Sequence, residues 1–317
     1  MNERSMPSRC FNQVIVDDNG RTITKRSQDE EKLRNEIMWY LRLPRALHSY
    51  LPDIISYSLS KGNVYVRLER VMLPSVHDLY MEAQHSLTMI DHIFNRLTEV
   101  LDAFACYRYP APFPTRFIQE MYVDKTVQRL QTWLTQSRWA AANYERGEWR
   151  LNGDAVPCPL RLLEKEGSYL MDKLKRPFAR IIHGDFCFSN LLMGREPQEM
   201  KLIDPRGSFG AAGIYGDVRY DLAKVRHSVG GYEHIMTDRF HVQQTCASLH
   251  AQLHQQPRHQ SWIVAWDERC GFLAPEVRGL EALLFLSMIP LHRDTPERQL
   301  MMYGLGTRKL LLALDEL

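Results

Sequence analysis

The stretch ARIIHGDFCFSNLLMGREPQEMKLIDPRGSFG, residues 179–210, decides the fold. Asn190 follows Asp185 by five residues, and an apolar run then leads into a turn. A second short apolar segment, residues 201–203, ends at Asp204. Pairing of the two apolar segments as strands would bring the side chains of Asp185, Asn190 and Asp204 to one end of a hairpin.

This arrangement suits phosphoryl transfer, which depends on metal ions at the phosphates and on a carboxylate that orients the attacking hydroxyl. Magnesium takes hard oxygen ligands, which Asn190 and Asp204 can supply. Asp185 is then available to accept a hydrogen bond from the substrate hydroxyl. The competing interpretation is that these are turn residues, since Gly, Asp and Asn are common in turns. The spacing of the whole set favours the catalytic interpretation.

HGDFCFSN (183–190) followed by IDPRG (203–207) resembles the catalytic and metal loops of the aminoglycoside phosphotransferase and choline kinase families, which are relatives of the protein kinases. Gly184 stands where the protein-kinase pattern H-R-D-x-x-x-x-N has Arg. The resemblance implies ATP as the donor, Asp185 as the catalytic base, and Asn190 with Asp204 as ligands of Mg²⁺.

The segment GDVRYDLAKV (216–225) is similar to the family's Asp-containing helix start. The resemblance implies that Asp221 braces the catalytic loop through backbone amides and performs no chemistry. His183 is assigned the same supporting role.

The first seventy residues have strand, strand, helix, strand, strand order. Residues 11–18 and 21–27 alternate as strands do, and Asn19-Gly20 between them is a strong hairpin signal. A helical stretch follows, with one apolar face. Two further strands are predicted at residues 53–60 and 63–71. The expected lobe is a small antiparallel sheet with one helix against it; the residues of that helical face are Leu33, Ile37, Tyr40 and Leu41.

This small lobe supplies a check on the kinase interpretation. A kinase needs an inward-facing Lys that touches the phosphates, held by a Glu on the next helix. Lys25 alternates with Ile23 on its strand, and Glu36 lies near the apolar face of the helix. We therefore predict Lys25 and Glu36 as the nucleotide-binding pair; the alternative is a surface lysine and a solvated helix glutamate.

The resemblance also implies an adenine site. Backbone groups near Glu69 and Val71 stand where the family has its hinge, and Leu192 and Ile203 would close the purine pocket; both aliphatic side chains could equally be ordinary core. One departure concerns the glycine-rich loop of kinases, for which this chain has only Ser5 to Arg9 ahead of the first clear strand. The choice of ATP over GTP is therefore open.

Helical periodicity dominates from about residue 74. Helices are expected from 85 to 107, from 115 to 144, from 160 to 175, and again after residue 234. We predict an α+β, two-lobed, protein-kinase-like fold, with a nucleotide-binding lobe in residues 1–72 and a helical lobe carrying the catalytic and metal loops in residues 73–317.

The balance of charged residues gives no indication of nucleic acid or membrane as a partner. Forty basic residues against 38 acidic ones create no global field toward nucleic acid or membrane. The start of the chain lacks the apolar run of a secretory signal, and no segment is long enough to span a bilayer. We expect a cytoplasmic protein, with its scattered cysteines reduced and none at metal-ligand spacing. The oligomeric state is open.

We expect the acceptor to be a small molecule with a hydroxyl group. Arg206 and Arg219 make the region near the catalytic aspartates locally basic, and arginine suits phosphate or carboxylate. We predict that both arginines bind a sugar, polyol or sugar-phosphate acceptor, as in surface-polysaccharide precursor synthesis. Equally open is that they form internal ion pairs with Asp217 and Asp221.

Other functions fit the same motifs. An aminoglycoside or amino-alcohol kinase, of the choline or ethanolamine type, would use the same chemistry. A protein kinase is disfavoured, because helical stretches fill the space that a peptide would need. An inactive nucleotide-binding pseudokinase is disfavoured by the presence of Lys25, Asp185, Asn190 and Asp204.

Overall fold

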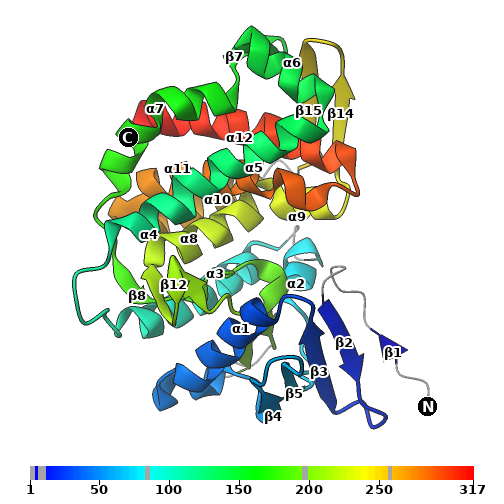
Figure 1. Ribbon diagram of the computed structural model, residues 1–317, viewed down its shortest axis with the longest axis vertical. Coiled ribbons are helices and arrows are strands. Elements are labelled where there is room, and N and C mark those ends of the chain that lie inside the picture. Colours follow the sequence, from blue (N-terminus) through cyan, green and yellow to red (C-terminus); the bar gives the residue numbers. More distant parts are fainter. Residues whose placement is uncertain (1–3, 6–11, 83–85, 195–198, 256–258) are drawn as a thin grey trace. The chain divides into compact units, whose positions relative to one another are not determined.

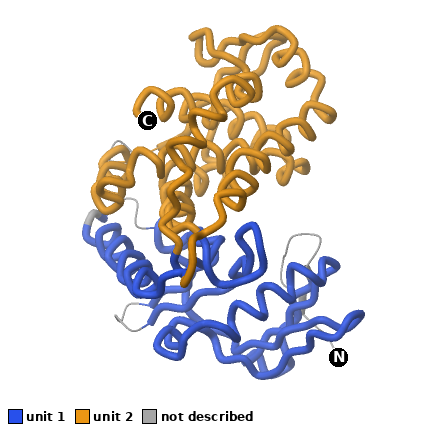
Figure 2. Tube along the Cα trace, turned by 60° about the vertical axis from the view of Figure 1, so that its left-hand side comes forward, with its two compact units in different colours: residues 1–109, 180–216 blue, residues 110–179, 217–317 orange. Residues whose placement is uncertain are grey.

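The computed structural model describes residues 4–5, 12–82, 86–194, 199–255 and 259–317. The chain divides into two compact units (Figures 1 and 2). Unit 1 comprises residues 1–109 and 180–216, and unit 2 comprises residues 110–179 and 217–317. These bounds differ from the predicted division at residue 72, because the catalytic stretch belongs to the same unit as the N-terminal sheet.

Unit 1 contains a five-stranded antiparallel sheet in the order β1-β2-β3-β5-β4. The predicted hairpin is confirmed: Val16 pairs with Ile23, and Gly20 in the turn has φ +68°, a conformation that glycine adopts without steric cost. A β-bulge between Ile54 and Ser56 interrupts the pairing of β4 with β5. The strands are β1 (Arg4–Ser5), β2 (Asn12–Val16), β3 (Thr22–Ser27), β4 (Ile54–Ser58) and β5 (Tyr65–Glu69).

Helix α1 (Glu30–Arg42) begins at Asp29, whose side chain accepts a hydrogen bond from the Lys32 amide. The buried face of this helix agrees with the predicted face at Leu33, Ile37 and Tyr40 but not at its fourth position. Trp39 is buried, whereas the side chain of Leu41 is 39% exposed. Helices α2 (Val76–Glu82) and α3 (Leu87–Ala105) follow in unit 1, and the apolar positions of α3 from Ile90 onward are buried as predicted.

The second segment of unit 1 carries the catalytic stretch on short strands. The predicted hairpin is present: β9 pairs antiparallel with β10, and Leu191 lies opposite Leu202. Both residues are fully buried, which fixes the register of the hairpin. The strands are β8 (Ala179–Ile181), β9 (Leu191–Met193), β10 (Met200–Leu202), β11 (Ser208–Phe209), β12 (Ala211–Ala212) and β13 (Tyr215–Asp217).

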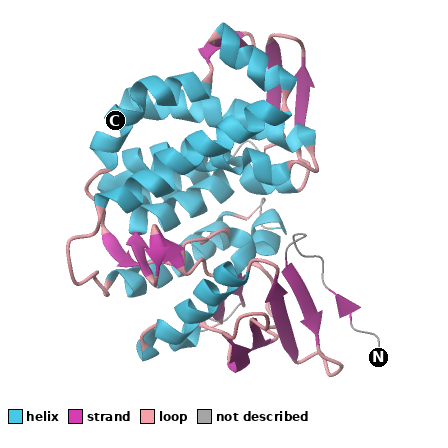
Figure 3. Cartoon of the chain, viewed as in Figure 1, coloured by secondary structure: helices cyan, strands magenta, loops and turns pink. Residues whose placement is uncertain are grey.

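Unit 2 is mostly helical (Figure 3). Helix α11 is buried along almost its whole length and packs against α12, α8 and α5. The helices are α4 (Thr115–Gln119), α5 (Lys125–Gln136), α6 (Arg138–Arg146), α7 (Pro159–Leu174), α8 (Val218–His227), α9 (Glu233–Met236), α10 (His259–Cys270), α11 (Ala274–Met288) and α12 (Pro296–Glu316).

The prediction of helices alone after residue 234 is wrong. A four-stranded sheet in the order β14-β15-β6-β7 interrupts the helices of unit 2. Leu249 and Ala251 are its buried residues on β15, and polar side chains alternate with them. The strands are β6 (Glu148–Leu151), β7 (Asp154–Pro157), β14 (Phe240–Gln244) and β15 (Ser248–Leu253).

Candidate active site

The predicted catalytic loop (residues 183–190) and the predicted metal loop (residues 203–207) meet at one end of the β9–β10 hairpin. A short 3₁₀ turn, Phe188–Asn190, leads directly into β9, and Asp204 follows β10 by two residues. The Ile203 amide donates to the Asn190 carbonyl oxygen at 3.0 Å. Because this bond continues the hairpin pairing, Asn190 and Asp204 lie at the same end of the hairpin, as the spacing predicts.

Asn190 and Asp204 offer oxygen atoms suited to a magnesium ion. The Asn190 Nδ2 donates to the carbonyl oxygen of Asp185 at 2.9 Å, so its Oδ1 is the atom left to act as a ligand. The Asp204 side chain is 49% exposed and can meet a bound ion. Both are hard oxygen donors, and nucleotide phosphates and water can complete six-fold coordination. Among the described residues, no group of three His, Cys, Asp or Glu side chains forms a metal site.

Lys25 links the N-terminal sheet to the metal loop. Its Nζ donates to the two carboxylate oxygens of Glu36 at 2.7 and 3.0 Å, and to Asp204 Oδ1 at 2.7 Å. Lys25 and Glu36 are buried, which confirms that the two residues pair inside the unit and not on its surface. Their role toward the phosphates remains a prediction.

Burial and mutual pairing shift the pKa values of Lys25 and Glu36. Burial lowers the pKa of Lys25, but the carboxylates of Glu36 and Asp204 outweigh burial, and the net pKa is raised. Burial raises the pKa of Glu36 to about 7, against the opposing effect of Lys25. Lys25 therefore stays cationic at neutral pH, so a phosphate could bind it, and a metal ion could compete with it for the Asp204 carboxylate.

His183 fixes the backbone around Asp185. Its Nδ1 accepts from the Asp185 amide at 3.3 Å, and its Nε2 is therefore protonated and donates to the Ile203 carbonyl at 3.0 Å. Burial lowers the pKa of His183 to about 4, so the ring is neutral at physiological pH. The carbonyl of His183 also accepts from the Arg206 amide at 2.9 Å. These contacts agree with the supporting role assigned to His183.

Helix α1 contributes two residues that the sequence did not single out for the site. The Trp39 Nε1 donates to the Ile182 carbonyl at 2.7 Å, and the Tyr40 hydroxyl accepts from the Asp204 amide at 3.2 Å. Both rings are 1% exposed. Buried Trp and Tyr rings usually place their polar atom against a partner, which is the signal that could have found them.

Arg206 lies against the loop that carries Asp185. Gly184 has φ +78°, and a Cβ there would lie 2.7 Å from the Cβ of Arg206. Glycine is therefore required at this position both for its conformation and for the close approach of Arg206. The Arg206 side chain is half-buried and packs on Gly184, the residue before Asp185.

The Arg219 side chain is enclosed within unit 2 and is not available to a substrate. Its guanidinium has no exposed surface and binds Asp217 through Nε at 2.9 Å and Nη2 at 2.6 Å. Asp217 is fully buried and begins helix α8 by accepting from the Arg219 amide. The structure therefore corrects the prediction of Arg219 as a substrate residue in favour of the internal ion pair. Asp221 is also fully buried in unit 2, and its bracing role remains a prediction.

The predicted adenine-binding residues all lie in unit 1. The Glu69 amide donates to the Asp53 carbonyl at 2.8 Å, so an adenine contact at Glu69 would have to use another group. Val71, Leu192 and Ile203 are half-buried. Of the predicted phosphate loop, Ser5 ends strand β1, which pairs with β2, and the remainder lies outside the described residues.

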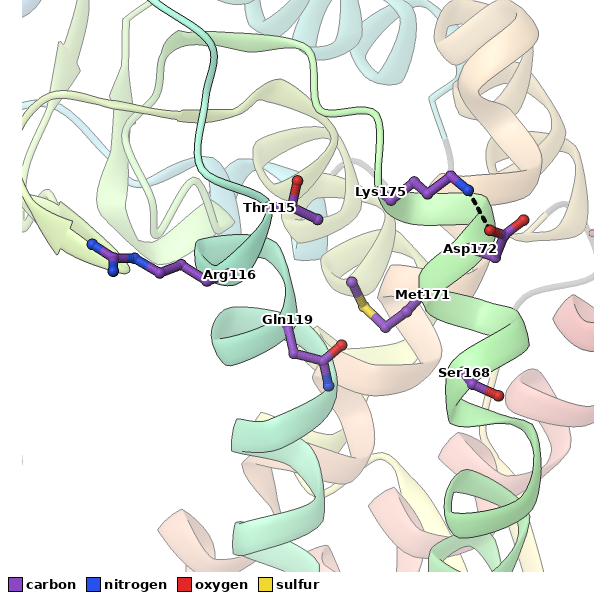
Figure 4. Close-up of a pocket in the computed structure, with 7 residues that line it drawn as sticks. All are labelled: Thr115, Arg116, Gln119, Ser168, Met171, Asp172 and Lys175. Atoms are coloured by element: carbon purple, nitrogen blue, oxygen red, sulfur yellow. Dashed lines mark hydrogen bonds and ion pairs between the residues drawn. The ribbon is translucent and has the colours of Figure 1, made fainter.

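A surface hollow of about 330 Å³ lies in unit 2 between α4 and the end of α7 (Figure 4). Lys175 is bound to Asp172, and Arg116 extends away from the hollow. The cavity therefore gathers no net positive charge for an anion, and none of the predicted site residues lines it. Its lining residues are Thr115, Arg116, Gln119, Ser168, Met171, Asp172 and Lys175.

Within the described residues, no helix has both the length and the apolar character needed to cross a membrane. No protein-family model matches the sequence, and no curated protein matches it.

Solved structures do resemble the chain. A thermostable mutant of aminoglycoside phosphotransferase APH(4)-Ia, in ternary complex with AMP-PNP and hygromycin B, matches with a TM-score of 0.58 and 13% identity over 97% of this chain and 94% of that one. The gentamicin–APH(2")-IIa complex matches with a TM-score of 0.54 and 10% identity over 98% and 91%. APH(3'')-Id from Streptomyces rimosus, with ADP and streptomycin, matches with a TM-score of 0.50 and 11% identity over 96% and 92%.

Identities this low establish a shared fold and not a shared substrate. The match confirms the predicted α+β, protein-kinase-like fold class and extends over nearly the whole chain. We conclude that the chain has the fold of the aminoglycoside phosphotransferases.

Proposed function

We propose that the protein is an ATP- and magnesium-dependent kinase that transfers the γ-phosphate to a hydroxyl of a small molecule. The observation that carries this proposal is the cluster in unit 1: Lys25, held by Glu36, reaches Asp204 at 2.7 Å. Asn190 lies at the same end of the hairpin and bonds the Asp185 carbonyl. A cation for the phosphates, two oxygen ligands and a half-buried carboxylate are the parts that phosphoryl transfer needs.

In this proposal Asp185 orients the acceptor hydroxyl and accepts its proton as the phosphoryl group is transferred. His183 holds the Asp185 amide, so the carboxylate is presented from a fixed backbone. Lys25 holds the nucleotide phosphates, and Glu36 keeps the lysine extended toward them. Magnesium, bound at Asn190 and Asp204, would neutralise charge on the β- and γ-phosphates.

The acceptor that we propose is a sugar, polyol or sugar phosphate. Arg206 supports this choice, because its side chain packs on Gly184 beside Asp185 and carries a guanidinium suited to phosphate or carboxylate. An anionic acceptor bound there would place its hydroxyl near the catalytic carboxylate. Arg219 gives no such support, because it is internally paired.

The test is ADP formation by the purified chain with Mg-ATP and a panel of neutral sugars, sugar phosphates, polyols, amino alcohols and aminoglycosides. The proposal predicts ADP release that depends on a hydroxyl acceptor and is lost in Asp185→Asn. Background hydrolysis alone across the panel, unchanged in the variant, would contradict it.

The second candidate is an aminoglycoside or amino-alcohol kinase. It is favoured by the fold match, since similar structures are complexes with hygromycin B, streptomycin and gentamicin. Arg206→Lys separates the two candidates because lysine keeps the charge but loses the planar fork. For an anionic acceptor, we expect kcat/KM for that acceptor to fall about a hundredfold, with background ATP hydrolysis unchanged. Full activity toward a cationic acceptor in Arg206→Ala would favour the second candidate.

A further inference from the structure

Helix α1 touches both functional loops with two adjacent side chains. The Trp39 indole donates to the carbonyl of Ile182, which precedes the catalytic loop, and the Tyr40 hydroxyl accepts from the amide of Asp204. Glu36, one turn earlier on the same helix, holds Lys25. One face of one helix therefore contacts the catalytic loop, the metal loop and the phosphate-binding lysine.

The Asp204 backbone needs such a contact. Its φ of +56° lies in the left-handed region, which is uncommon for a residue with a Cβ and is maintained only where the surroundings fix it. The amide at this strained position points at the Tyr40 oxygen. The Tyr40 ring is 1% exposed and stacks edge-on against Trp39, so the hydroxyl is a rigid acceptor.

A second contact shows how closely the metal loop lies on this helix. Gly207 has φ +65°, and a Cβ there would lie 2.0 Å from the carbonyl oxygen of Asn35 on α1. No side chain fits between the loop and the helix at this point. The loop is therefore attached at Asp204 through Tyr40 and pressed against the helix backbone at Gly207.

We propose that Tyr40 is a positioning residue whose hydroxyl holds Asp204 in its left-handed conformation, so that the carboxylate is aimed for metal binding. The catalytic consequence rests on the proposed function, whereas the hold on the Asp204 amide does not. A tyrosine that served only to fill the core would need its ring and not its hydroxyl, and this difference makes the proposal testable.

The test is Tyr40→Phe, which removes the hydroxyl and keeps the ring. Tyr303→Phe is the matched control: Tyr303 is also 1% exposed, and its hydroxyl bonds Cys158 in unit 2. We expect hydrogen exchange of the amides in residues 200–207 to become about tenfold faster in Tyr40→Phe only. We also expect kcat to fall about tenfold and the magnesium concentration for half-maximal activity to rise, with neither change in the control.

Faster exchange without any acceptor-dependent activity in the wild type would support the hold on Asp204 and overturn only the proposed function. Exchange and kinetics like those of Tyr303→Phe would overturn the proposal. If Tyr40→Phe does not fold, the exchange rate of the Asp204 amide in the wild type decides: protection supports the proposal, and exchange at the rate of an open loop overturns it.

Discussion

Asp204 and Asp217 both pair with a cation, yet they stand in opposite environments. Asp204 bonds Lys25 at 2.7 Å with its side chain 49% exposed and its backbone in the left-handed region. Asp217 bonds Arg219 at 2.6 Å with no exposed surface, and it also accepts from the Tyr122 hydroxyl at 3.0 Å. The first aspartate keeps a solvent-facing side, and the second is enclosed by donors.

Under the proposed function, this difference separates the ion pair at the metal site from a purely structural ion pair. A metal ion can approach Asp204 and compete with Lys25 for its carboxylate, because that side chain retains access to solvent. Asp217 has no such access, and its donors come from segments as distant as Tyr122 and Phe178. The exposed carboxylate of Asp204 is therefore available to a ligand, whereas the complete set of buried partners around Asp217 indicates a contribution to stability.

The largest expected effect is on catalysis. Asp185→Asn and Asp204→Asn should each lower kcat about a thousandfold, because they remove the proposed base and a proposed metal ligand. Their melting temperatures should stay close to that of the wild type, since both side chains have access to solvent. Steady-state kinetics and thermal melts check this. If the variants lose stability in proportion to activity, Asp185 and Asp204 are structural residues like Asp217, and the prediction is wrong.

Asp217→Asn should show the reverse pattern. It removes the nearer carboxylate from the buried Arg219 and leaves only Glu276 at 3.6 Å, and breaking a buried pair in this way typically costs about 3–5 kcal/mol of unfolding free energy. The kcat of the folded protein, measured at low temperature, should change less than about twofold. Urea denaturation measures the loss, and a large fall in kcat with normal stability would instead assign Asp217 to the chemistry.

Acid should destabilise both units through buried neutral histidines. Burial lowers the pKa of His183 in unit 1 to about 4, and that of His234 and His259 in unit 2 to about 4 and about 3. Below pH 6.5 the histidines of the unfolded chain become protonated, whereas these folded rings stay neutral. The unfolding free energy that they contribute is therefore complete above pH 6.5 and is lost as the pH falls toward 4. Each histidine contributes up to about 1.4 kcal/mol per pH unit.

Urea midpoints between pH 7 and pH 5 measure this slope. His183→Gln and His234→Gln should each flatten it, while the exposed His241 provides the control as His241→Gln. A slope that is unchanged in both buried variants, or flattened equally in the control, would show that other groups carry the acid response.

The sequence alone predicted the parts of the site that depend on local pattern. Strand alternation placed Lys25 inside, helical spacing placed Glu36 near it, and paired apolar segments brought Asn190 and Asp204 together. The sequence of β15 also has the pattern of a strand, since Leu249, Ala251 and Leu253 alternate with polar residues.

Other features depend on contacts between distant segments, which local pattern does not encode. Arg219 is buried because the Leu174 carbonyl, 45 positions away, and Asp217 both accept from its guanidinium; the sequence left the Asp217 pair open as an alternative but did not indicate the Leu174 contact. Tyr40 reaches Asp204 across 164 positions in the sequence. The periodicity of the helix identified Tyr40 as core but could not identify the partner of its hydroxyl.

The most direct test of the central claim is calorimetric titration of ATP into the wild type and Asp204→Asn, with magnesium and with EDTA. A site built from Asn190 and Asp204 predicts that magnesium tightens ATP binding about tenfold or more in the wild type and has little effect in Asp204→Asn. ATP binding that is indifferent to magnesium in the wild type, or equally magnesium-dependent in the variant, would contradict the assignment of these residues as the metal site.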